Sequence, residues 1–142
     1  MIVSAKGRYA LRVMVSLAKS EGRVVPLKEI AQNEAIPHKF LENIMTELAK
    51  AGLVEGSRGK NGGYRLTRPP ERYTVAEILN VTELSFAQTG CSHTGSSGGG
   101  CAEKDDGGCP RADVCPTLPM WQAFDETVNE FFSRYTLESL IK

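Results

Sequence analysis

Four cysteines within one 25-residue stretch are the residues of this sequence best suited to chemistry. They are Cys91, Cys101, Cys109 and Cys115. Residues 1–7 contain no apolar stretch of the signal-peptide type, so we expect a cytoplasmic protein. In that compartment, clustered cysteines indicate a metal or redox site more readily than structural disulfides.

The cysteine spacing leaves two chemistries open. Zinc accepts four thiolates, but structural zinc sites usually contain more closely spaced cysteine pairs than Cys109 and Cys115, which are separated by five residues. A dithiol switch, in which these two cysteines form a disulfide on oxidation, would leave the other two without a role. The sequence has no C-x-x-C motif, no phosphate-binding loop and no evident small-molecule substrate site, so we expect a protein that is not an enzyme.

The charged residues are divided unevenly along the chain. Residues 1–72 carry 13 Lys and Arg against 7 Glu, whereas residues 73–142 carry 4 basic against 10 acidic residues. The first half can therefore bind phosphate, although the net charge of the whole chain is zero. No apolar run approaches the roughly 20 residues that span a membrane, so we expect no membrane partner. A chain of 142 residues suits one core, extended by a partner subunit.

Helical periodicity predicts three helices in the basic half. The first covers about residues 3–19, the second opens at Pro26-Leu27, and the third follows a break at residues 33–37. Apolar residues of the third helix repeat at helical spacing, as Leu41, Ile44, Met45 and Leu48. Its other face is polar and is predicted to be exposed, with His38, Lys39, Glu42, Asn43 and Lys50.

Two short β-like segments, residues 53–57 and 64–67, follow the third helix. They are joined by Arg58-Gly59-Lys60-Asn61-Gly62-Gly63, whose Asn-Gly-Gly run is expected to supply the positive φ angles of a tight hairpin. Helix, helix, turn, helix and hairpin in this order form the winged helix-turn-helix arrangement. We therefore predict a mainly α fold with a small β-hairpin, and a DNA-binding domain over residues 1–70.

The second half is predicted to contain three further parts. Thr74 and Glu77 form a capping-box pattern that opens a connecting helix within residues 71–87. Residues 88–116 are rich in Cys and Gly and show no periodicity. Residues 117–142 are expected to form a long C-terminal helix and a final turn. Its apolar stripe could pack on the first helix as core or form a dimer contact, and it consists of Trp121, Phe124, Val128, Phe131 and Tyr135.

Several short motifs occur together and in a fixed order. They are Ser4-Ala5-Lys6-Gly7-Arg8-Tyr9, Phe40-Leu41-Glu42, Gly52-Leu53-Val54, Arg58-Gly59 with Gly62-Gly63-Tyr64, the cysteine segment followed by Trp121, and Thr136-Leu137-Glu138. Over nearly its whole length, the chain thus resembles the winged-helix transcription regulators of the IscR/NsrR/CymR family. The resemblance implies a homodimer on a palindromic double-stranded DNA operator, dimerised through the C-terminal helix. It also implies an iron–sulfur cluster near that helix, whose state changes which promoters are bound.

The cluster ligands that the resemblance implies are Cys101, Cys109 and Cys115. The fourth ligand departs from the family pattern. Leu118 stands where some relatives have a histidine ligand, and Arg8 stands where others supply an acidic ligand from the partner's first helix. Cys91 is the natural substitute, and His93 is the next candidate. The cluster could hold two or four irons, and zinc or no metal are the alternatives.

For DNA, the start of the third helix is expected to contact bases and nearby phosphates through His38, Lys39, Glu42 and Asn43. The hairpin is expected to reach the minor groove or phosphates through Arg58 and Lys60. Looser phosphate contacts are expected from Arg8 and Lys28, whereas Arg65 and Arg68 are interpreted as ordinary surface charges. Two rival functions are a small iron–sulfur electron-transfer protein and a winged helix that binds only proteins. An electron carrier would leave the basic half without a purpose, and the basic hairpin tip argues against a winged helix that binds only proteins.

Overall fold

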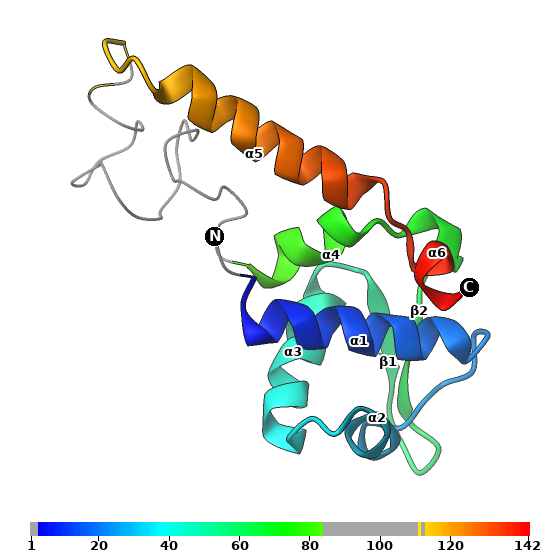
Figure 1. Ribbon diagram of the computed structural model, residues 1–142. Coiled ribbons are helices and arrows are strands. Elements are labelled where there is room, and N and C mark those ends of the chain that lie inside the picture. The colour runs from blue at the N-terminus through cyan, green and yellow to red at the C-terminus, as the bar shows by residue number, and fades with distance from the viewer. Residues whose placement is uncertain (1–2, 84–110, 112) are drawn as a thin grey trace.

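The computed structural model describes residues 3–83, 111 and 113–142 (Figure 1). Within these residues the chain forms six α-helices, one short 3-10 helix and one two-stranded antiparallel sheet. The elements are α1 Ala5–Lys19, α2 Leu27–Glu34, α3 His38–Lys50, β1 Val54–Ser57, β2 Gly63–Leu66, η1 Pro70–Arg72, α4 Val75–Thr82, α5 Leu118–Ser133 and α6 Leu137–Ile141. The predicted mainly α fold with a β-hairpin and a long C-terminal helix is confirmed.

The core is built around α1 and α3. Ser4 caps α1 by accepting the Gly7 N–H at 3.1 Å, and the helix then buries one stripe of apolar side chains. The four apolar residues predicted to face inward from α3 are all completely buried. Elements from the second half join the same core, through Tyr73, Ile78 and Leu137. The described residues therefore share one hydrophobic core.

The hairpin pairs β1 with β2 from Val54 opposite Leu66 to Ser57 opposite Gly63. The prediction that the Asn-Gly-Gly run supplies its positive φ angles is wrong, because the positive φ of this turn is at Gly59, at +107°. Gly63 is required for a different reason: a Cβ there would lie 2.2 Å from the Val25 carbonyl oxygen. The backbones of Val25 and Tyr64 exchange two hydrogen bonds, of 2.8 and 2.9 Å. This close approach fastens the hairpin to the segment before α2.

The chain's C-terminal helix α6 docks beside the start of α4. The Leu137 N–H donates to the Tyr73 carbonyl at 3.1 Å, and the Val75 N–H donates to the Tyr135 carbonyl at 2.9 Å. Leu137 is fully buried, so α6 is part of the core. A capping box between Thr136 and Ser139 starts this short helix.

Helix α5 extends along one side of the molecule and packs mainly against α4 (Figure 1). None of its residues is buried. The interpretation of its apolar stripe as a core stripe on α1 is therefore wrong. Met120 is 55% exposed, Phe124 37%, Phe131 49% and Tyr135 42%. No helix among the described residues combines the length and apolar character needed to cross a membrane.

Candidate nucleic-acid interface and cysteine site

The first two turns of α3 present a polar edge to solvent. His38, Lys39, Glu42 and Asn43 are all exposed there, as predicted. His38 Nδ1 lies 3.2 Å from Glu42 Oε1 one turn later, and both side chains keep about half of their surface exposed, at 54% and 53%. The side chains predicted to contact bases are therefore exposed and adjacent. The carboxylate of Glu42 lies beside the imidazole of His38 on the same helix face.

The other predicted DNA contacts come from three elements. Arg58 and Lys60 are exposed in the turn between β1 and β2, Lys28 is exposed on α2, and Arg8 is exposed in the first turn of α1. None of these four cations forms an ion pair with another described residue. Figure 1 shows that the start of α3, α2 and the hairpin tip lie toward one edge of the molecule, opposite α5. The elements that carry most of the predicted contacts, namely α2, α3 and the hairpin tip, thus lie at one edge. Arg8 lies on α1.

Arg65 and Arg68, which we interpreted as ordinary surface charges, are both paired. Arg65 pairs with Glu55 across the hairpin. Arg68 lies 2.7 Å from Glu77, and this hydrogen bond is the main reason that the pKa of Arg68 is raised above its ordinary value. These arginines strengthen the base of the hairpin rather than its tip.

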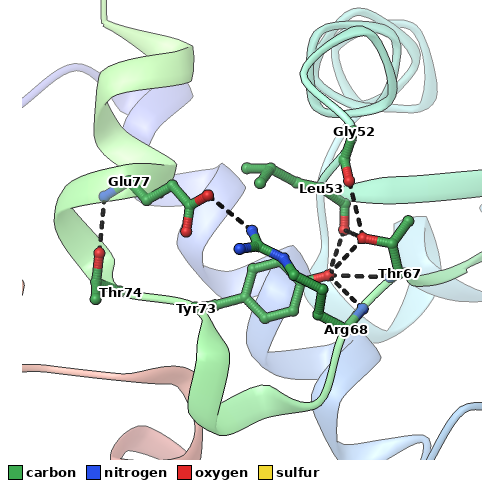
Figure 2. Close-up of polar contacts among 7 residues, drawn as sticks. All are labelled: Gly52, Leu53, Thr67, Arg68, Tyr73, Thr74 and Glu77. Carbon is green, nitrogen blue, oxygen red and sulfur yellow. Dashed lines mark hydrogen bonds and ion pairs between the residues drawn. The ribbon is translucent and has the colours of Figure 1, made fainter.

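The base of the hairpin is anchored by Tyr73, whose side chain is fully buried. Its hydroxyl donates to the Leu53 carbonyl at 2.7 Å and accepts the N–H groups of Thr67 and Arg68, both at 3.0 Å (Figure 2). The Arg68 guanidinium lies over the Tyr73 ring, 4.3 Å from its centroid. One side chain therefore joins the residue before β1 to the two residues after β2 and fixes the direction of the hairpin.

The first turn of α1 is held from two sides. The backbone N–H and hydroxyl of Ser4 donate to Glu83 Oε1, at 3.1 and 2.7 Å, and Lys6 forms an ion pair with Glu47 of α3. Gly7 allows this approach, because a Cβ there would lie 2.2 Å from the same Glu83 oxygen. The start of α1 is thus tied both to the end of α4 and to α3.

Cys115 is the candidate cluster ligand that the structure describes. It is half-buried three residues before α5, and its Sγ lies 3.3 Å from Thr117 Oγ1. Hydrogen bonding by Thr117 lowers the pKa of the Cys115 thiol and so favours the thiolate, the form that binds metals. Cys91, His93, Cys101 and Cys109 lie outside the described residues. Among the residues that are described, no three potential ligands come together.

Comparison with known proteins decides the family. Residues 3–142 match the Rrf2 family model, described as iron-dependent transcriptional regulators. The protein belongs to the Rrf2 family. This result confirms the resemblance inferred from the sequence motifs.

Individual Rrf2 relatives match the whole chain. The transcriptional regulator IscR of Xenorhabdus nematophila is 33% identical over 143 residues, covering 100% of this chain and 80% of the relative. The structure of CymR (YrzC), the global cysteine regulator of B. subtilis, has a TM-score of 0.72 at 31% identity and covers 99% of this chain and 96% of that one. The structure of T. potens IscR has a TM-score of 0.71 at 29% identity, covering 99% and 86% of the two chains.

Rrf2 membership fixes the class of function. The protein is a DNA-binding transcriptional regulator with a winged-helix fold, and it is not an enzyme. An electron carrier and a winged helix that binds only proteins do not fit this family. The family motifs also acquire physical reasons: Ser4 caps α1, Gly7 admits Glu83, and Gly63 admits the Val25 backbone.

Sequence reasoning missed the contacts that hold the hairpin and the start of α1 in place. Tyr73 and Glu83 are each joined to residues distant in the chain, and neither belongs to a local periodic pattern. The one local signal for Tyr73 was an aromatic residue shortly after Pro69-Pro70, which does not indicate its partner.

Proposed function

We propose that this regulator docks on DNA with the start of α3 in the major groove and the hairpin beside it. His38, Lys39, Glu42 and Asn43 would contact base edges and nearby phosphates, and Arg58 and Lys60 would contact the minor groove or phosphates. Arg8 and Lys28 would add looser phosphate contacts. The observation that carries this proposal is the exposed polar edge of α3 beside cations that form no ion pair with another described residue.

Glu42 is assigned a role in base reading because of its charge. A carboxylate within a basic edge repels phosphate, so binding improves only where it accepts a hydrogen bond, as from the amino group of cytosine. His38 Nδ1 lies 3.2 Å from the carboxylate, on the same helix face. Glu42 therefore supplies discrimination between sequences rather than general affinity.

The docking is tested by selecting operators from a random duplex library and titrating them by gel shift at several salt concentrations. We expect Glu42→Ala to relax discrimination between bases, and Arg58→Ala to weaken binding to all duplexes and lower the salt slope by about 1. Glu71→Ala and Arg72→Ala are matched controls, because both residues are exposed on η1. Unchanged binding by both test variants would contradict the docking.

The proposal includes a homodimer formed through α5. The exposed apolar residues Phe124, Phe131 and Tyr135 recur at helical spacing and leave an apolar face of a kind that soluble monomers rarely expose. A second copy would cover this face and place two recognition helices on successive half-sites. In sedimentation experiments we expect Phe124→Glu to yield monomers, and Asn129→Glu, on another face of α5, to remain dimeric. A dimeric Phe124→Glu protein would exclude this interface.

The proposal also includes a metal or redox sensor in the cysteine segment. Cys101, Cys109 and Cys115 would hold an iron–sulfur cluster, with Cys91 as the fourth ligand and His93 as the alternative. Support comes from the iron-dependent description of the family, the IscR relatives, and the thiolate-favouring contact of Cys115 with Thr117. When bound, such a cluster would supply a redox-sensitive centre. A zinc site or a metal-free thiol switch is the alternative.

The sensor is tested on protein purified without oxygen, by its absorbance spectrum and its iron, sulfide and zinc content. We expect a coloured protein that contains iron and sulfide. Alanine variants of Cys101, Cys109 and Cys115 should lose the colour, and comparing Cys91→Ala with His93→Ala identifies the fourth ligand. Colourless protein that iron and sulfide cannot reconstitute would overturn the cluster, and bound zinc would favour the zinc alternative. The DNA-binding proposal would stand in either case.

A further inference from the structure

A groove of about 640 Å³ lies between α1 and α2, and Cys115 is not among the residues that line it. Its volume falls within the range of known small-molecule sites. Leu11, Val15, Val25 and Leu140 provide apolar walls, so α6 also contributes one residue to it. Neither the DNA-binding edge nor the proposed sensor makes use of this groove.

Two ion pairs join charged residues that line the groove. Arg12 Nε lies 3.2 Å from Glu34 Oε2 near the end of α2, and Arg23 Nη2 lies 2.8 Å from Glu29 Oε1 near its start. Each pair links α1, or the turn after it, to α2. The charges of these four residues cancel one another. Any net charge in the groove must therefore come from a further residue.

That residue is Lys19, which lines the groove and forms no ion pair with another described residue. Ser16 stands one turn earlier on α1, and Asn33 lines the facing side on α2. The hydroxyl of Ser16 and the side-chain amide of Asn33 form no hydrogen bond with described residues. Three groups able to donate hydrogen bonds, one of them a cation, thus share a groove with apolar walls.

We propose that this groove binds a small organic carboxylate. The carboxylate would pair with the Lys19 ammonium and accept hydrogen bonds from Ser16 and Asn33, while its apolar chain would cover Val15 and Leu140. One uncompensated cation matches one negative charge, whereas a doubly charged phosphate would leave charge unbalanced in the groove. The inference does not depend on the cluster or on the DNA contacts, since none of the residues that line the groove takes part in either proposal.

The test uses full-length protein, isothermal titration and three ligands with the same chain: octanoate, octanol and octylammonium. We expect octanoate to bind about three- to fivefold more tightly than octanol, and octylammonium to bind no better than octanol, because an ion pair with the exposed Lys19 contributes up to about 1 kcal/mol. Lys19→Met should lose this advantage. Lys50→Met, which removes an exposed lysine of α3 outside the groove, should retain it.

Amide NMR shifts on adding octanoate locate the ligand. We expect them to gather on α1 and α2 around Ser16, Lys19 and Asn33. Equal affinities for octanoate and octanol, an undiminished affinity of folded Lys19→Met, or shifts centred on the apolar face of α5 would each overturn the proposal. The carboxylates butanoate, hexanoate and decanoate are tested beside octanoate, and a lack of binding by all four would also overturn the proposal.

Discussion

Replacing Tyr73 with Phe tests whether one buried hydroxyl anchors the hairpin. The change leaves the buried Leu53 carbonyl without its donor at 2.7 Å, which costs about 1–3 kcal/mol. The N–H groups of Thr67 and Arg68 lose their acceptor, but Thr67 is exposed and Arg68 is half-buried, so we add only about 0.5 kcal/mol for each. We therefore expect the free energy of unfolding to fall by about 2–4 kcal/mol. The Thr67 hydroxyl, 3.4 Å from the Leu53 carbonyl, can partly replace the donor and favours the lower value.

Urea unfolding at one fixed protein concentration measures this loss, because stability of an oligomer depends on concentration. Tyr64→Phe is the matched control: Tyr64 lies in the same hairpin, and its hydroxyl forms no hydrogen bond with a described residue. We expect the control to change stability by less than about 0.5 kcal/mol. Similar losses for the two variants would refute the anchoring role of the Tyr73 hydroxyl.

Three further substitutions test the supporting contacts by the same unfolding measurement. Gly63→Ala should lower the free energy of unfolding by about 2 kcal/mol, because its Cβ would press on the Val25 carbonyl and break the two hydrogen bonds between Val25 and Tyr64. Wild-type stability of this variant would contradict the close packing at Gly63. Ser4→Ala should cost about 1–2 kcal/mol through loss of the α1 cap and of the bond to Glu83, and a loss below about 0.3 kcal/mol would exclude both roles. Thr136→Ala removes the α6 capping box and should lower the free energy of unfolding by about 1 kcal/mol. An unchanged urea midpoint would contradict this role of the capping box.

The parts of this fold that sequence could predict are those set by local periodicity. In α3 the apolar spacing alone determines which face is buried, so both the buried and the exposed residues were predicted correctly. The hairpin was located to within a residue, but the role of Gly63 was missed, because it depends on Val25 approaching from another part of the chain. Tyr73 and Glu83 were missed for the same reason.

Helix α5 shows a different limit of sequence reasoning. Its apolar stripe was recognised, but periodicity identifies a face without identifying what covers it. The structure excludes burial of the stripe within this chain's described core, since no residue of α5 is buried. The partner that covers it is then a matter for experiment. Periodicity predicts secondary structure well, while tertiary and quaternary contacts require coordinates.

Ion pairing explains how a chain with no net charge can present a surface suited to DNA. Among the basic residues of the first half, the structure holds five in ion pairs with glutamates, namely Lys6, Arg12, Arg23, Arg65 and Arg68. The cations without such partners include every one that we assigned to DNA, namely Arg8, Lys28, Lys39, Arg58 and Lys60. Phosphate binding depends on cations that are free to displace the counterions condensed on DNA, rather than on the overall charge of the protein. Four glutamates of this half and Glu77 of the second half therefore pair with its structural cations, and the cations that we assign to DNA form no ion pair with described residues. Glu42 lies among the residues that we assign to DNA, and we expect it to discriminate between bases.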